Sequence, residues 1–283
     1  MSDNDDSAVR IRPITVEGAN GRLAARLYTP MQRRQSGHGL IVFFPCGGFV
    51  TCELEPGDPF MTTLAQRTGW DVLISSYTLP QVQPFPAAVE DAHAVLAWTV
   101  HNRSALDWDG KRLITAGVEA GGNLAAVSAL MARDRGGPEL AAQILVMPML
   151  DPGLTSCSMR SVDDAQGAAR AASECAAGYR DYLPRAIDRT HPYASPLQSS
   201  RMRGLPPALI LSAGDDPLRD EAEQYGAKLA SAGIHAVVKR LPPLPLEEPK
   251  ARHQCASKEH ALQELEAFVA SISRSASGNR KSA

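Results

Sequence analysis

The 283-residue sequence has no long hydrophobic run, no closely spaced cysteine pair and no strong excess of either charge. No stretch approaches the roughly 20 apolar residues that cross a bilayer, so we do not expect a membrane span. Lys and Arg number 29 against 31 Asp and Glu, and the net charge of −2 does not favour nucleic acid as a partner. The acidic first ten residues lack the pattern of a secretion signal, so we expect a cytoplasmic protein.

The five cysteines are an odd number without a CxxC motif, and the seven histidines show no metal-ligand spacing. We therefore expect no disulfide framework, no metal ion and no other cofactor. Apolar residues make up 44% and charged residues 21%, the composition of an ordinary globular chain. A chain of this length can bury a sufficient core without such cross-links.

Apolar runs that predict buried strands alternate with amphipathic segments that predict helices. An antiparallel hairpin is expected at 14–18 and 22–28, followed by strands at 39–45, 71–77, 112–118, 144–150, 207–214 and 235–241. Helices are expected at 59–68, 86–102, 222–233 and 257–272, with another that begins at about Ala120. The order predicts an α/β fold with an eight-stranded, mostly parallel sheet and helices on both faces.

No linker divides the chain, and we expect one domain over residues 1–272. Residues 1–20 and about 152–190 are expected to contribute to a small helical cap, because the second segment is the least strand-like part of the interior. The Ser-, Arg- and Lys-rich segment 273–283 predicts a disordered tail.

The strand predicted at 112–118 runs directly into GVEAGG (117–122) at the start of a helix. A strand–turn–helix with small flanking residues is typical of a nucleophile elbow, where the turn is strained and the helix packs close to the sheet. The central position of this elbow holds Glu119. The N–H group of Ala120, directly after it, is a candidate oxyanion donor.

Two further segments follow buried strands and carry candidate site residues. PCGGF (45–49) offers the backbone N–H groups of Cys46, Gly47 and Gly48 as oxyanion donors, whereas Pro45 has no N–H. Asp216 follows the strand at 207–214, where the acid of a Ser–Asp–His triad lies.

These motifs resemble the hormone-sensitive-lipase-like bacterial esterases of the α/β-hydrolase fold. The resemblance covers about residues 38–240 and also includes SYTLPQVQPFPAA (76–88), VEDAHAVLAW (89–98), PYASPL (192–197), LPPALILSAG (205–214) and DPLRDE (216–221). It implies the α/β-hydrolase fold and carboxylic-ester hydrolysis as the ancestral activity.

The sequence departs from the pattern of these esterases where catalysis would take place. Glu119 stands where the resemblance implies the nucleophilic serine, and Pro45-Cys46 stand where it implies His-Gly. Segment 241–248, where it implies the catalytic histidine, contains none. For His253 and His260 a surface position is favoured over the role of a displaced base, and His253, expected in a loop, is the better candidate of the two. Without a histidine, Asp216 is expected to remain a plain carboxylate or to pair with a nearby arginine.

Two functions are compatible with this pattern. The first is a pseudo-hydrolase that binds a small acyl-type or lipophilic ligand, or a protein partner, with the Glu119 carboxylate folded back into the oxyanion hole. The second is an enzyme in which Glu119 acts as a general acid or base, or less readily as a nucleophile, on a carbonyl or ester substrate. For Cys46, packing is favoured over nucleophilic catalysis. A homodimer is compatible with either of these two functions.

Ordinary esterase activity is expected to be absent, or at least about 10³-fold below that of an active relative. The reason is that the elbow offers no hydroxyl group on which an acyl-enzyme could form.

Overall fold

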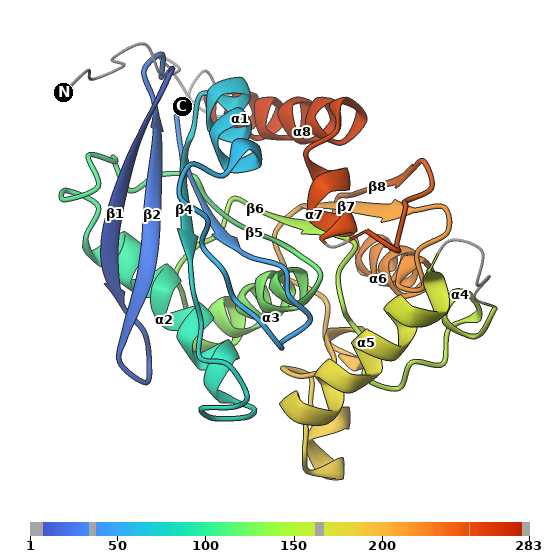
Figure 1. The fold of residues 1–283 in the computed structure, drawn as a ribbon. Helices are drawn as coiled ribbons and strands as arrows, with labels where there is room; N and C mark the ends of the chain where they lie inside the picture. The colour runs from blue at the N-terminus through green and yellow to red at the C-terminus, as the bar shows by residue number, and fades with distance from the viewer. Residues whose placement is uncertain (1–7, 34–37, 162–166, 249, 279–283) are drawn as a thin grey trace, which may run out of the picture.

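The computed structural model describes residues 8–33, 38–161, 167–248 and 250–278 (Figure 1). Its eight strands form one sheet in the order β1-β2-β4-β3-β5-β6-β7-β8. The strands are β1 (Val9–Glu17), β2 (Arg22–Pro30), β3 (Leu40–Phe44), β4 (Asp71–Ser75), β5 (Leu113–Val118), β6 (Ala142–Val146), β7 (Ala208–Ala213) and β8 (Ala236–Leu241). β2 is antiparallel to β1 and β4, and the other neighbouring pairs are parallel. The expected sheet is therefore confirmed.

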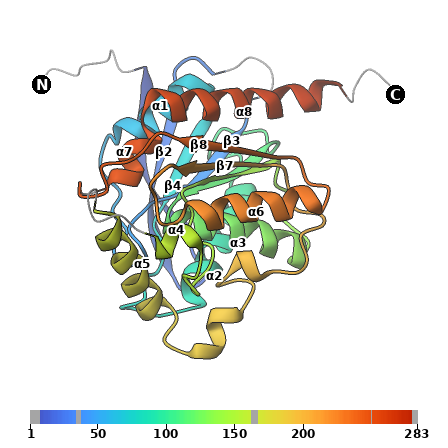
Figure 2. The same cartoon turned by 90° about the vertical axis from the view of Figure 1, so that its right-hand side faces the viewer.

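Helices cover both faces of the sheet. α1 (Pro59–Thr68), α7 (Ala251–Ala256) and α8 (Glu259–Gly278) lie on one face, and α2 (Ala87–His101), α3 (Ala120–Arg135) and α6 (Arg219–Ser231) lie on the other (Figure 2). Among the described residues, no helix has the length and apolar character that a bilayer crossing requires.

Strand β3 shows why the central strands are apolar throughout. Leu40, Val42 and Phe44 pack into the core that faces α2, α3 and α6. Ile41 and Phe43, which alternate with them, pack into the core that faces α1 and α8. Because both faces of the strand are covered, apolar residues occupy both sets of alternate positions.

Two expectations at the ends of the chain are wrong in part. Residues 9–17, assigned to the cap with the rest of 1–20, form the edge strand β1, which pairs with β2 over its whole length. Val9 and Val16 are buried, which anchors both ends of this strand. Residues 273–278, assigned to a disordered tail, continue α8, where the buried Ser273 hydroxyl donates to the carbonyl of Val269. Residues 279–283 lie outside the described residues.

The segment expected as a cap at about 152–190 contains α4 (Cys157–Arg160), α5 (Ala168–Tyr182) and the 3₁₀ helix η2 (Ala186–Thr190). α5 packs directly against the loop that follows β3. A Cβ at Gly178 would lie 1.9 Å from the carbonyl oxygen of Gly48, so the two backbones touch. The rings of Phe49 and Tyr182 stack beside this contact, with centroids 3.9 Å apart. α5 is thereby fixed over the residues expected to donate to an oxyanion.

The predicted elbow between β5 and α3 is a sharp turn at Glu119, with φ 58° and ψ −113°. The turn brings α3 against the backbone of the sheet. A Cβ at Gly117 would lie 2.2 Å from the carbonyl carbon of Gly121, and a Cβ at Gly121 would lie 2.0 Å from the carbonyl oxygen of Phe44. Only glycine fits these two positions, which explains the small residues of the motif.

This packing predicts that Gly121→Ala destabilises the protein although alanine is the better helix former. The added methyl group meets backbone that cannot rotate away, and overpacking of this kind costs about 1–3 kcal/mol. The free energy of unfolding in urea measures the effect. Ser128→Ala in the same helix is the control, because it removes a buried hydroxyl that has no partner and adds no atom. An unfolding free energy equal to or above that of the unsubstituted protein for Gly121→Ala would contradict the close approach.

Candidate functional site

The candidate site lies where β3, β5 and β7 end. Because these strands are parallel, the loop that follows β3, the elbow at Glu119 and the loop that contains Asp216 meet at one edge of the sheet. α7 reaches the same edge from the segment that follows β8. The sequence therefore brings together four segments that are far apart along the chain.

The side chain of Glu119 is folded back onto the loop that follows β3. Its Oε2 accepts hydrogen bonds from the backbone N–H groups of Gly47 and Gly48, at 3.0 and 3.1 Å. The carboxylate also lies at the N-terminus of α3, where the helix dipole favours negative charge. Cys46 and Ala120, the other two expected donors, make no hydrogen bond to this carboxylate. Glu119 thus occupies two of the amides that were expected to bind an oxyanion.

Arg252, which sequence analysis missed, connects Glu119 to Asp216. Its Nη1 donates to Oε1 of Glu119 at 2.6 Å, while its Nε and Nη2 donate to the two carboxylate oxygens of Asp216 at 2.8 and 3.0 Å. The side chains of Glu119, Arg252 and Asp216 are only 14%, 8% and 0% exposed. We call this arrangement the Glu–Arg–Asp triad. Arg252 is the arginine with which Asp216 was expected to pair.

The Glu–Arg–Asp triad keeps its central guanidinium charged. Burial alone would lower the pKa of Arg252, but the negative charges of Asp216 and Glu119 raise that pKa well above its ordinary value. Asp216 receives one further hydrogen bond, from the N–H of Leu218 at 2.9 Å. At neutral pH the group between the two carboxylates is therefore a permanent cation with no lone pair to accept a proton.

His253 does not complete a catalytic triad. It lies in α7 and not in a loop, and its Nε2 is 3.1 Å from Oδ2 of Asp58, which caps the N-terminus of α1. Consecutive residues of a helix point about 100° apart, so Arg252 faces Asp216 while His253 faces α1. In the described ranges His253 bonds neither Glu119 nor Asp216. It lines the cavity in front of Glu119 without joining the Glu–Arg–Asp triad.

Cys46 is unsuited to nucleophilic catalysis. Burial and the negative charge of Glu119 raise the pKa of its thiol to about 12. The reactive thiolate is therefore scarce at neutral pH. The favoured packing role suits its position at the edge of the core that faces α1 and α8.

A cavity of about 460 Å³ opens in front of Glu119 and Arg252. Gly47 and Gly48 lie on one side, and Ala171 and Ala177 of α5 lie on another. This volume suits a small organic molecule. In the part of the chain that the structure describes, no three His, Cys, Asp or Glu side chains gather in a way that would hold a metal ion.

Comparison with known proteins gives consistent matches. The family with the alpha/beta hydrolase fold matches residues 41–245. Esterase LipI of Mycobacterium tuberculosis is 33% identical over 231 residues, which are 80% of this chain and 71% of LipI. A thermostable esterase from Pseudomonas putida superposes with a TM-score of 0.81 at 28% identity, over 93% of this chain and 84% of that one. A hyperthermophilic esterase from Pyrobaculum calidifontis gives 0.76 at 33% identity, over 94% and 86%.

The burial of the Glu–Arg–Asp triad predicts a large stability loss for Arg252→Gln. The substitution leaves the buried carboxylate of Asp216 and the partly buried one of Glu119 without their shared cation, which should lower the free energy of unfolding by about 3–5 kcal/mol. Urea unfolding measures the loss. Arg67→Gln is the matched control, because Arg67 also contacts two carboxylates, but those of Glu259 and Glu266 are 61% and 39% exposed, so this variant should lose little. Equal losses for the two variants would contradict the inferred role of burial.

The raised pKa of Cys46 predicts that its thiol resists alkylation in the folded protein at pH 8. The exposed thiol of Cys157 serves as the internal control and should react with iodoacetamide. Peptide mapping by mass spectrometry measures both in one sample. Modification of Cys46 as fast as that of Cys157 would restore Cys46 as a candidate nucleophile.

Proposed function

The chain belongs to the α/β-hydrolase family and is similar to its esterases, and on this basis we propose that it is a pseudo-hydrolase that has lost the serine nucleophile. In this proposal it binds a small acyl-type or lipophilic molecule in the cavity in front of Glu119 without cleaving it. One observation carries the proposal: the Glu119 carboxylate bonds the amides of Gly47 and Gly48 and the guanidinium of Arg252 at once.

Acyl transfer needs a nucleophile, a base that accepts its proton, and free donors for the developing oxyanion. At position 119 the nucleophile is replaced by a carboxylate that itself fills the donors. The guanidinium of Arg252 lies between residue 119 and Asp216, where a base would be required, and it cannot accept a proton. All three requirements therefore fail together, which favours binding without hydrolysis.

The same contacts weigh against Glu119 as a general acid or base. Each of its carboxylate oxygens already accepts a hydrogen bond, one from a guanidinium and the other from two amides. A substrate proton would therefore have to compete with these donors for the lone pairs of the carboxylate. Catalysis by Glu119 would first require the side chain to leave Gly47 and Gly48.

The cavity supports a ligand with one apolar part. Val50, Ala171, Ala177 and Leu246 provide apolar surface, while Glu119 and Arg252 provide the polar end. Ala177→Trp should fill this space and weaken retention of 4-nitrophenyl butyrate in equilibrium dialysis, with the ester recovered intact. Asp181→Trp, at an exposed position of the same helix, is the control. Equal retention by both variants would place the ligand elsewhere.

Glu119→Ser should give a folded protein with less than a tenfold gain in ester hydrolysis, because Arg252 remains where a base would be needed. Hydrolysis of C2–C6 nitrophenyl esters by the unsubstituted protein, Glu119→Ser and Glu119→Gln measures this, with an active esterase of the family as the positive control. A serine-directed fluorophosphonate should not label the unsubstituted protein.

Two results would contradict the pseudo-hydrolase. Recovery of ordinary esterase rates in Glu119→Ser would mean that a histidine reaches the site. Turnover by the unsubstituted protein that is lost in the isosteric Glu119→Gln would instead identify Glu119 as an acid or base.

A further inference from the structure

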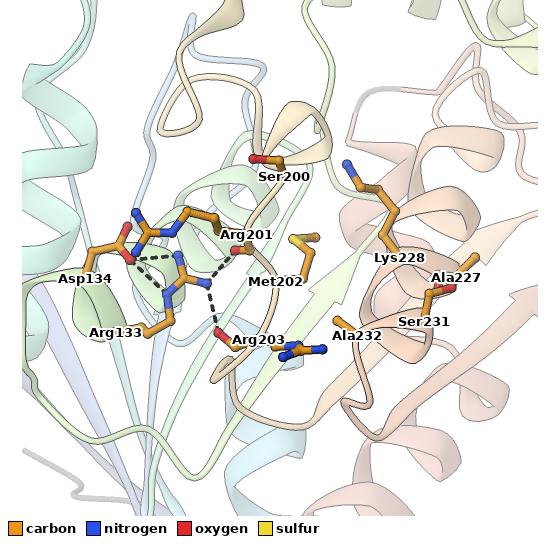
Figure 3. Close-up of a pocket in the computed structure, with 10 residues that line it drawn as sticks. All are labelled: Arg133, Asp134, Ser200, Arg201, Met202, Arg203, Ala227, Lys228, Ser231 and Ala232. Atoms are coloured by element: carbon orange, nitrogen blue, oxygen red, sulfur yellow. Dashed lines mark hydrogen bonds and ion pairs between the residues drawn. The ribbon is translucent and has the colours of Figure 1, made fainter.

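A second cavity, of about 770 Å³, lies at the other end of α3 (Figure 3). Arg133 and Asp134 at the end of α3 and the segment 200–203 form one side, and Lys228 and Ser231 of α6 form the other. The helical rise of 1.5 Å per residue puts Arg133 about 20 Å from Glu119 along α3. This cavity, called here the basic groove, is therefore separate from the candidate site.

The basic groove is lined by four cations, Arg133, Arg201, Arg203 and Lys228, against the single carboxylate of Asp134. That carboxylate is already engaged, by Arg133 at 2.7 Å and by the hydroxyl of Tyr193 at 3.0 Å. The chain as a whole carries a net charge of −2. The groove is thus a local region of positive charge on a slightly negative protein, and such a region attracts anions.

Two of the cations hold the rim of the groove in place. Lys228 Nζ donates to the carbonyls of Leu197 and Ser199, at 2.6 and 2.8 Å. Arg133 Nη1 donates to the carbonyls of Arg201 and Arg203, at 2.5 and 3.2 Å. Segment 197–203 is therefore held in place at four of its carbonyls. Little conformational entropy would be lost when a ligand binds to it.

The other two cations make no hydrogen bond or ion pair with the described residues, although Arg201 lies close enough to Asp134 for its charge to act on that carboxylate. Met202 is buried and anchors the chain, while Arg201 and Arg203 on either side of it are exposed. Figure 3 shows the side chain of Arg201 extending toward Asp134 and that of Arg203 extending the other way, below Met202. Within the described ranges, no carboxylate lies within ion-pair distance of either guanidinium. Each one keeps its fork of N–H donors free for an external acceptor.

Compensation of helix dipoles accounts for only part of this charge. α3 and α6 both end near the groove, and cations in a last turn offset the negative end of a helix. Arg133 and Lys228 occupy such positions. Arg201 and Arg203 come from the segment that precedes β7, and no carbonyl at either helix end accepts a hydrogen bond from their side chains.

We propose that the basic groove binds a phosphate-bearing ligand through Arg201 and Arg203. Arginine matches the oxygens of phosphate with paired, charge-assisted hydrogen bonds. Two guanidinium groups whose N–H donors are free suit a multiply charged phosphate better than a singly charged carboxylate. The third N–H of the Lys228 ammonium, which no carbonyl of the described residues accepts, is available from the opposite side.

Pyrophosphate titrated into the full-length protein by isothermal calorimetry tests the proposal. We expect saturable binding at one site, weakened at least tenfold in Arg201→Gln/Arg203→Gln. Arg10→Gln/Arg189→Gln is the matched control, because it removes the same charge from exposed positions outside the groove and should bind within twofold of the unsubstituted protein. The salt dependence of binding should also fall in the groove variant, since fewer cations meet the phosphate.

Co-sedimentation with phosphatidylcholine vesicles that contain phosphatidic acid separates two sources of the phosphate. Sedimentation that is lost in the groove variant would identify a lipid headgroup, whereas pyrophosphate binding without sedimentation would identify a soluble ligand. Absence of pyrophosphate binding, or equal affinity in the groove and control variants, would overturn the proposal.

Discussion

The buried guanidinium of Arg252 is the interaction on which the candidate site depends. It binds Asp216 with two hydrogen bonds and Glu119 with one, and so ties α7, the loop after β7 and the elbow together. Two carboxylates cannot share so dry a site without a cation between them. The one negative charge left over is stabilised by the amides of Gly47 and Gly48 and by the start of α3. The position of Glu119 therefore follows from Arg252 as much as from the elbow.

The scaffold around this guanidinium is one that esterases use for catalysis. A strained elbow places residue 119 above the sheet, and close glycine contacts hold it there. Donors that can stabilise a transient oxyanion can also hold a permanent carboxylate, because both present a negatively charged oxygen to the N–H groups. In the proposed function, the fold keeps these donors while the residue at the centre of the elbow binds them itself.

The sequence was sufficient to predict the sheet, the elbow and the positions of Glu119 and Asp216, because local patterns specify them. Apolar runs mark strands covered on both faces, and glycines mark the turn. Arg252 was missed because it lies 133 residues from Glu119, in a six-residue helix after a proline-rich stretch that carries no periodic signal. The sequence analysis selected its neighbour His253 instead, because histidine is the more common catalytic base. Whether Arg252 or His253 points toward Asp216 depends only on the rotation of α7 about its own axis.

The two ends of α3 show what separates an occupied site from an available one. Negative charge at the N-terminus and positive charge at the C-terminus both complement the helix dipole. At the N-terminal end the charges bond one another, and an external anion would have to displace Glu119. At the C-terminal end the carbonyls of the rim accept hydrogen bonds from Arg133 and Lys228, while the N–H donors of the Arg201 and Arg203 guanidinium groups have no acceptor among the described residues. Anion binding is therefore expected where the guanidinium donors are free and not at the elbow, where Glu119 already occupies the donors.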